Sequence, residues 1–183
     1  MTSRSTIGID PALTNIGMVC LVRGASFNSF GSDLVQPKNL RDLARLSYIQ
    51  DQVKHFIQER NAELVVLEGY DYKGHNLAQL GEASGVIKLI CHQLGLPVLV
   101  VSPASVKKFS TGNSNASKEL VMARYGLSNE HVADARALAE IGLVYLTGVS
   151  QFRHELEVIK QLKTTKVKKP VMKRNLAKLP VAI

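Results

Sequence analysis

The sequence predicts an α/β fold in which a mixed five-stranded sheet carries helices on both faces. Three observations predict it. The chain opens with three short apolar segments joined by glycine-containing turns, as in an antiparallel meander. Two later segments are continuously apolar, as parallel strands buried on both sides are. Elsewhere, apolar residues recur three and four positions apart, which is the helical period.

The opening strands are predicted at residues 5–10, 16–22 and about 26–32. A long helix follows over residues 39–60, where charged side chains fall between the apolar ones. The residues expected to pack this helix against the sheet are Leu40, Leu43, Leu46, Ile49, Val53, Phe56 and Ile57.

The two continuously apolar strands are predicted at residues 64–68 and 97–101, with a helix over residues 75–94 between them. Ser102 and Pro103 begin a short helix, because serine is a good N-cap and proline suits the first helical position. Further helices are expected at residues 116–125 and 128–147.

The charge of the chain is unevenly distributed. With 183 residues, 45% of them apolar, the chain is long enough for one packed domain. Residues 1–150 carry 14 Lys and Arg against 13 Asp and Glu, whereas residues 151–183 carry nine against two. We therefore divide the chain into a domain over 1–150 and a basic C-terminal tail over 151–183. The tail is either an arm that contacts phosphates or a solubilising, disordered terminus.

Several protein classes are disfavoured. Cys20 and Cys91 each lie among apolar residues, so they are expected to be small buried side chains, not a disulfide or a metal pair. The N-terminus lacks the apolar stretch of a secretory signal, and no segment approaches the roughly 18 apolar residues of a membrane span. A reducing, cytoplasmic location without a membrane partner is expected.

Four residues are candidates for a shared site. Asp10 and Glu68 each end a predicted buried strand, and parallel neighbours would bring both to one edge of the sheet, where ligands bind. His131 and Asp134 share one face of the last predicted helix. Taken singly, each could cap a turn, lie on the surface or begin a helix. Together they favour a site for two divalent cations, since clustered carboxylates repel one another without them. Such a site predicts phosphodiester hydrolysis.

In order and spacing, several segments resemble the RuvC-like Holliday junction resolvases of the ribonuclease H-like superfamily, across about residues 5–147. They are Gly8-Ile9-Asp10-Pro11, Leu67-Glu68-Gly69-Tyr70, residues 80–86, Val106-Lys107-Lys108, residues 116–121 and residues 134–139. The resemblance implies a ribonuclease H-like homodimeric endonuclease that cuts opposed strands of four-way DNA junctions in recombination and repair. A phage-type member is one candidate.

By position, Asp10, Glu68 and Asp134 match the family's catalytic, metal-binding carboxylates. The resemblance implies magnesium, with two ions per active site, and no small-molecule cofactor. His131 matches a fourth position that is Asp in many members. An imidazole is a softer ligand than a carboxylate, so His131 either helps the site accept manganese or helps to deprotonate the attacking water.

Three lysines are candidates for contact with DNA. Lys107 and Lys118 match basic positions near the family's active site, Lys108 adds another cation, and Lys118 is also a catalytic candidate. Each could instead be an exposed lysine on a helix face. The family often places an aromatic residue after the second acid, to stack on a base. Asp71 holds that approximate position here, so the stacking candidates are Tyr70 and Tyr72.

Two questions stay open at this point. Gly81 and Gly85, four residues apart on a predicted helix, indicate either the two-fold dimer interface or close packing within one chain. The substrate is also open, because related folds act on several nucleic acids: other branched DNA, RNA, or binding without efficient cleavage are the alternatives to the four-way junction.

Overall fold

The computed structural model describes residues 3–24, 28–69 and 76–164. Its strands form one sheet in the order β3-β2-β1-β4-β5. β2 is antiparallel to β1 and β3, whereas β4 is parallel to β1 and β5, which confirms the predicted mixed sheet. The strands are β1 (Arg4–Asp10), β2 (Ile16–Arg23), β3 (Asn28–Val35), β4 (Leu64–Glu68) and β5 (Val98–Val101). The helices are α1 (Asp42–Gln58), α2 (Leu77–Gln93), α3 (Pro103–Thr111), α4 (Lys118–Tyr125), α5 (Glu130–Thr147) and α6 (Arg153–Thr164).

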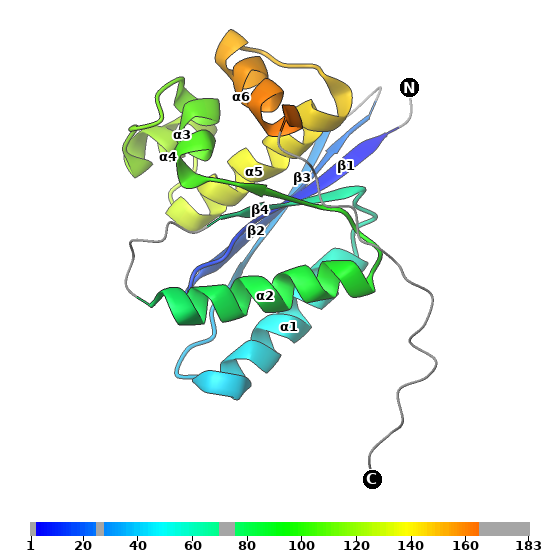
Figure 1. Ribbon diagram of the computed structural model, residues 1–183, viewed down its shortest axis with the longest axis vertical. Coiled ribbons are helices and arrows are strands. Elements are labelled where there is room, and N and C mark those ends of the chain that lie inside the picture. Colours follow the sequence, from blue (N-terminus) through cyan, green and yellow to red (C-terminus); the bar gives the residue numbers. More distant parts are fainter. Residues whose placement is uncertain (1–2, 25–27, 70–75, 165–183) are drawn as a thin grey trace.

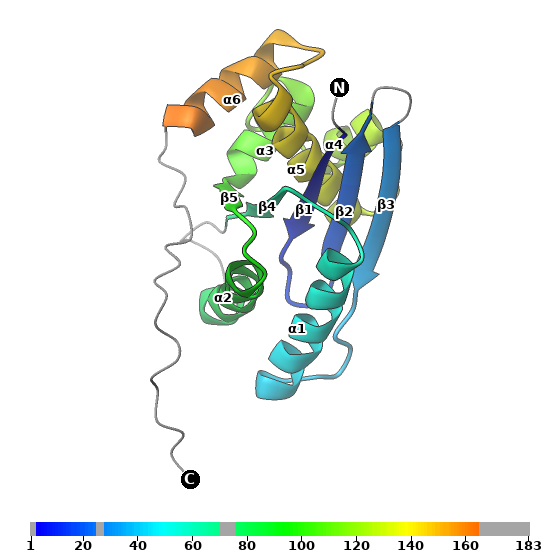
Figure 2. The same ribbon diagram turned by 90° about the vertical axis from the view of Figure 1, so that its right-hand side faces the viewer.

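Helices cover both faces of the sheet, as predicted (Figures 1 and 2). α1 and α2 pack on one face, where Ile7 and Ile9 of β1 and Val65 and Leu67 of β4 join a single apolar core with them. α5 crosses the other face, and α3 and α6 pack beside it in a second core that contains Val66. The sheet is therefore buried between two helical layers.

α5 lies unusually close to the sheet because glycines face it. A Cβ atom on Gly8 would lie 2.0 Å from the carbonyl oxygen of Ala135, and one on Gly17 would lie 2.1 Å from that of His131. Thr6 Oγ1 donates a buried hydrogen bond to the carbonyl oxygen of Ala139 at 2.6 Å. These contacts hold the first turns of α5 over the end of β1 and the start of β2.

Two element boundaries differ from the prediction by three residues, and the others by fewer. α1 begins at Asp42, not 39, and its predicted apolar stripe is only partly buried: Leu43 is 81% exposed and Leu40 36%. The periodicity continues for about a turn past the region that the sheet covers, since the start of α1 projects beyond the strand ends (Figure 2). β3 runs on to Val35, because its pairing with β2 continues to Ile16.

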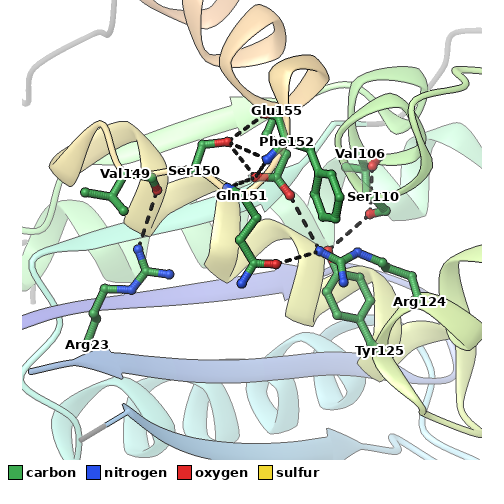
Figure 3. Close-up of polar contacts among 10 residues, drawn as sticks. All are labelled: Arg23, Val106, Ser110, Arg124, Tyr125, Val149, Ser150, Gln151, Phe152 and Glu155. Carbon is green, nitrogen blue, oxygen red and sulfur yellow. Dashed lines mark hydrogen bonds and ion pairs between the residues drawn. The ribbon is translucent and has the colours of Figure 1, made fainter. Parts of the chain in front are cut away.

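α6 was not predicted, and it lies beyond the expected domain boundary at residue 150. Val158 and Ile159 are buried in the second core. Figure 3 shows how the helix is fastened: the buried carboxylate of Glu155 accepts hydrogen bonds from Ser150 Oγ at 2.7 Å and from the backbone N–H of Gln151 at 3.0 Å. Its other oxygen lies 3.6 Å from Arg124 Nη2 of α4. The packed domain therefore extends into the expected tail, and residues 165–183 lie outside the described residues.

Both cysteines are free and buried, as predicted, and burial raises the pKa of each thiol. Among the described residues, no helix is long and apolar enough to cross a membrane.

Candidate active site

Strand alternation directs Asp10 toward α5. In β1, Ile7 and Ile9 face the α1–α2 layer, while Thr6 and Gly8 contact α5. Successive side chains of a strand point to opposite faces, so Asp10 follows Thr6 and Gly8 onto the α5 side. Its side chain is almost fully buried there.

Glu68 lies next to Asp10 in the neighbouring strand. Ile9 pairs with Leu67 in the parallel ladder, so Asp10 and Glu68 are the next residues in their strands. Val66 faces the α5 layer and Glu68 follows it by two positions, so both acids belong to the same face. The carboxyl ends of two parallel strands thus carry adjacent acids at one edge of the sheet, as predicted.

The start of α5 brings His131 and Asp134 to the same edge. Asn129 caps the helix by accepting a hydrogen bond from the backbone N–H of Val132 at 3.1 Å. His131 Nδ1 then lies 2.7 Å from Asp10 Oδ2, and the two side chains are only 16% and 8% exposed. This hydrogen bond joins residues 121 positions apart in the chain.

The acids of the cluster share one electrostatic environment. Burial, followed by the charge of Asp10 and a hydrogen bond with it, raises the pKa of Glu68 far above its ordinary range, and Asp134 contributes as well. Burial and the charge of Asp10 raise the pKa of Asp134 to about 6. The hydrogen bond to Asp10 raises the pKa of His131. Protons on these groups offset an excess of negative charge.

The donor atoms suit a hard divalent cation, but they are not assembled around one point. Within residues 3–24, 28–69 and 76–164, no three His, Cys, Asp or Glu side chains converge closely enough to hold a metal ion. Asp10 instead accepts the hydrogen bond from His131. Carboxylate oxygens are the ligands that Mg²⁺ prefers. The pKa values of Glu68 and Asp134 are raised first by burial and then by the charge of Asp10, and a cation would favour the ionised forms of both groups. The residues therefore fit a metal after side-chain rearrangement.

Among the three predicted lysines, Lys118 is the one whose charge acts to lower the pKa values of Glu68 and Asp134. It begins α4 and forms an ion pair with Glu130, the first residue of α5. Partial burial acts to lower its pKa, but the hydrogen bond and charge of Glu130, with the charges of Asp134 and Asp10, raise it overall. The site thus contains a cation next to its acids.

The other residues predicted to contact DNA lie on α3 or outside the described residues. Lys107 and Lys108 lie on α3, and Lys108 Nζ is 3.4 Å from Glu157 of α6. Tyr70 and Tyr72 lie outside the described residues.

One glycine of the pair on α2, Gly85, faces open space. A Cβ atom on Gly85 would have no described heavy atom within 4 Å, so close packing within the chain does not account for this glycine. Leu89, four residues further along the same helix, is 55% exposed.

Glu130 is a site residue to which the sequence assigned no role. Besides its ion pair with Lys118, its Oε1 lies 3.8 Å from His131 Nε2. It therefore links the cation of α4 to the histidine of the acidic cluster. The sequence offered one signal for this role, the position of Glu130 next to His131. It gave no sign of the ion pair, because Lys118 belongs to another helix.

Comparisons with known proteins point to one family. Residues 6–140 match the family model described as crossover junction endodeoxyribonuclease RuvC. The chain is 30% identical over 146 residues to the protein of that name from Caldicellulosiruptor saccharolyticus, covering 73% of this chain and 88% of the relative. It is also 30% identical over 123 residues to that of Nocardia farcinica, covering 64% of this chain and 65% of the relative. The match thus spans just under two thirds of the Nocardia protein.

Two solved structures are similar to this one. The T. thermophilus RuvC in complex with Holliday junction substrate has a TM-score of 0.62 and 28% identity, covering 74% of this chain and 90% of that chain. A second Thermus thermophilus RuvC structure has a TM-score of 0.65 and 24% identity, covering 79% and 96%, and it supports the fold.

Proposed function

Because the chain belongs to the RuvC family of crossover junction endodeoxyribonucleases, we propose that it cleaves four-way DNA junctions by hydrolysing a phosphodiester bond in each of two opposed strands. The observation that carries the proposal is that Asp10, Glu68, His131 and Asp134 lie near one another and share one electrostatic environment where two parallel strands end. A buried cluster of repelling acids is costly for folding alone, and a hydrolytic site accounts for it.

In this proposal, Asp10, Glu68, Asp134 and His131 hold two divalent cations. Three of the four ligands are carboxylates, so Mg²⁺ is the expected ion, and the imidazole makes Mn²⁺ acceptable. When bound, the ions supply Lewis-acid stabilisation of the phosphate and a water that ionises near neutral pH.

The protein's own groups have distinct roles in the reaction. Hydrolysis adds a water oxygen to phosphorus, breaks one P–O bond to the sugar and delivers a proton to the departing oxygen. His131 has two alternative roles: it holds an ion, or, with Nδ1 bound to Asp10, it uses Nε2 to accept the proton that the water loses. Lys118 places a positive charge beside the acids, where it can hold the scissile phosphate.

Binding of the junction arms is assigned to the basic residues around the site. Lys107, Lys108 and Lys118 begin or lie on helices of the α5 side and contact backbone phosphates in this proposal. Tyr70 and Tyr72 remain the candidates for stacking on a base, and the basic segment after residue 164 is a candidate DNA arm.

We place the two-fold dimer at the outer face of α2, where Gly85 is open and Leu89 is 55% exposed. Two copies give two active sites, which paired cleavage of opposed strands needs. Gly85→Arg is expected to convert a dimer into monomers in analytical ultracentrifugation, whereas Gln93→Arg at the end of the same helix leaves the dimer intact. A wild-type protein that is monomeric throughout would contradict this placement.

The central test is cleavage of a labelled synthetic four-way junction by Asp10→Asn. This variant is expected to lose at least about a thousandfold in cleavage rate with Mg²⁺ while it still binds the junction, since binding depends on phosphate contacts. Asp51→Asn, an exposed change on α1, is the matched control and should cleave normally. Cleavage by Asp10→Asn at the wild-type rate would rule out the assignment.

The substrate is tested separately with a panel of four-way junction, three-way fork, RNA–DNA hybrid and linear duplex. Paired symmetric nicks in the junction are expected. Preferential cutting of another member would change the substrate but keep the active site, whereas salt-sensitive binding without nicking in Mg²⁺ or Mn²⁺ would indicate a binding protein.

A further inference from the structure

A pocket of about 540 Å³ lies beside residues 11–15, which connect β1 to β2. These residues follow Asp10 directly, and three of them, 13–15, line the pocket. The remaining walls come from the connection between β3 and α1 and from the starts of α1 and α2. The pocket thus opens at the same edge of the sheet as Asp10, but toward the α1–α2 layer.

The lining has an unusual chemistry. It contains five carboxamide side chains, and none of the described residues that line it is acidic. The carboxamides are Asn15, Gln36, Asn39, Asn76 and Gln79. Gln36 Nε2 donates to Asn15 Oδ1 at 2.8 Å, while the side chains of Asn76 and Gln79 form no hydrogen bond with any residue that the structure describes. A carboxamide offers both a donor and an acceptor, so it can match the edge of a nucleobase.

Two cations complete the lining. Lys38 and Arg45 both face the pocket, and no ion pair joins either of them to the described part of the chain. Arg45 Nε is buried and has no hydrogen-bond partner there. Leaving a buried polar group of this kind unpaired costs free energy, which a bound acceptor would recover. An arginine and a lysine without acidic partners are suited to a phosphate.

Apolar side chains supply the third feature that a nucleotide needs. Leu13 and Leu40 line the same pocket, and Leu40 is 36% exposed instead of packing in the core. A flat base can pack its face against such side chains while its edge meets the carboxamides.

We propose that this pocket receives one nucleotide displaced from the DNA near the scissile phosphate, with its base among the carboxamides and its phosphate at Lys38 and Arg45. It thereby sets the sequence preference of cleavage. The inference rests on the proposed function for the identity of the DNA substrate. Unstacking a nucleotide costs least where the duplex is already interrupted, as it is at a branch point.

The first experiment maps contacts without needing cleavage. The full chain is bound to four-way junctions that carry 5-iododeoxyuridine at single positions beside the branch point, irradiated, and digested for mass spectrometry. Crosslinks to peptides containing residues 36–45 or 76–79 are expected from one strand position. Crosslinks confined to other segments, or no stable junction binding, would overturn the proposal.

The second experiment tests specificity with a junction library randomised around the branch point. Gln79→Ala is expected to lower discrimination at one position by about tenfold, the effect of losing one base contact. Arg45→Gln should weaken junction binding several-fold and reduce its salt dependence. Gln93→Ala and Lys54→Gln, exposed changes elsewhere, are the matched controls.

The outcomes separate the two proposals. If the wild-type protein crosslinks at the pocket but cuts no junction, the proposed function fails and the nucleotide site stands. If it cuts with a sequence profile that Gln79→Ala leaves unchanged, the nucleotide site fails and the proposed function stands. Gln79 is exposed, so its variant is expected to fold normally.

Discussion

His131 donates a hydrogen bond from Nδ1 to Asp10 Oδ2 over 2.7 Å, and this contact links the first turn of α5 to the end of β1. It also explains how a histidine can occupy a position beside buried acids. A carboxylate at this position would add a third negative neighbour to Asp10, after Glu68 and Asp134, whereas the imidazole supplies a donor. The metal-free cluster is therefore partly neutralised from within.

His131→Asp removes that donor and replaces the imidazole with a carboxylate. We expect the metal-free variant to unfold several degrees below the wild type, since a loss of about 1 kcal/mol lowers the melting temperature of a domain of this size by about 2–4 °C. Mg²⁺ should restore most of the difference and support cleavage. The measurement is thermal denaturation with and without Mg²⁺.

His92→Asp, at an exposed position near the end of α2, is the control for adding a carboxylate in place of a histidine. If His131→Asp and His92→Asp shift the melting temperature equally, the Asp10 contact has no special role in stability.

The stability of the metal-free protein should decrease as pH rises from 5 to 8. The pKa values of Glu68, His131 and Asp134 are all raised by folding. A raised pKa means that the folded state binds the proton more tightly, so the stabilisation is complete below the ordinary pKa and is lost as pH passes the folded one. For Asp134, with a pKa of about 6, the loss falls within this window.

Glu68→Gln should make this pH dependence shallower and raise the melting temperature at pH 8, because a neutral amide removes one ionisable acid from the cluster. It should also abolish cleavage. Glu82→Gln, an exposed change on α2, should leave the melting profile unaltered. A metal-free protein that becomes more stable between pH 5 and pH 8 would show that folding does not raise the pKa values of these groups.

The same argument predicts that Mg²⁺ competes with protons. The thermal stabilisation at a fixed Mg²⁺ concentration should grow as pH rises from 5.5 to 8, since the ion needs the ionised forms of Glu68 and Asp134. Asp134→Asn is expected to weaken this growth, while Asp51→Asn on α1 keeps it. Equal stabilisation by Mg²⁺ at both ends of the range would contradict the assignment of these ligands.

Lys118 and Glu130 should have opposite effects on the enzyme. Lys118→Gln is expected to lower kcat/KM on a four-way junction by about 10- to 100-fold, because it removes the cation that we propose holds the scissile phosphate. Glu130→Gln releases Lys118 from its ion pair and removes a negative charge, so junction binding should tighten or stay unchanged. Lys54→Gln, on the exposed side of α1, is the control. If Glu130→Gln impairs binding as strongly as Lys118→Gln, Glu130 does not compete with phosphate for this lysine.

The succession of strands and helices along the chain and the acids at two strand ends could be predicted because they depend on local periodicity. The role of Glu130 could not, since it depends on where α4 places Lys118. The register of β1 against β4, which makes Asp10 and Glu68 neighbours, is likewise a long-range property.

α6 shows a second limit of sequence reasoning. The buried residues Val158 and Ile159 stand among many charged ones, so the segment was interpreted from its basic composition as a tail and its amphipathic helix was missed. The contact that fastens it, between Glu155 and Arg124, joins two separate helices. Conversely, Leu43 has the helical spacing of a core residue but is 81% exposed, because periodicity does not reveal where the sheet ends.

Gly8 tests whether the close approach of α5 to the sheet positions the active site. A Cβ atom at Gly8 would lie 2.0 Å from the carbonyl oxygen of Ala135, so Gly8→Ala must displace the helix that carries His131 and Asp134. Overpacking of this kind costs about 1–3 kcal/mol, and we expect lower thermal stability together with a loss of cleavage larger than the loss of junction binding. Gly31→Ala in β3, where the nearest described atom would be 3.6 Å away, is the matched control. Unchanged cleavage by a folded Gly8→Ala protein would mean that the first turn of α5 can shift without disturbing the cluster.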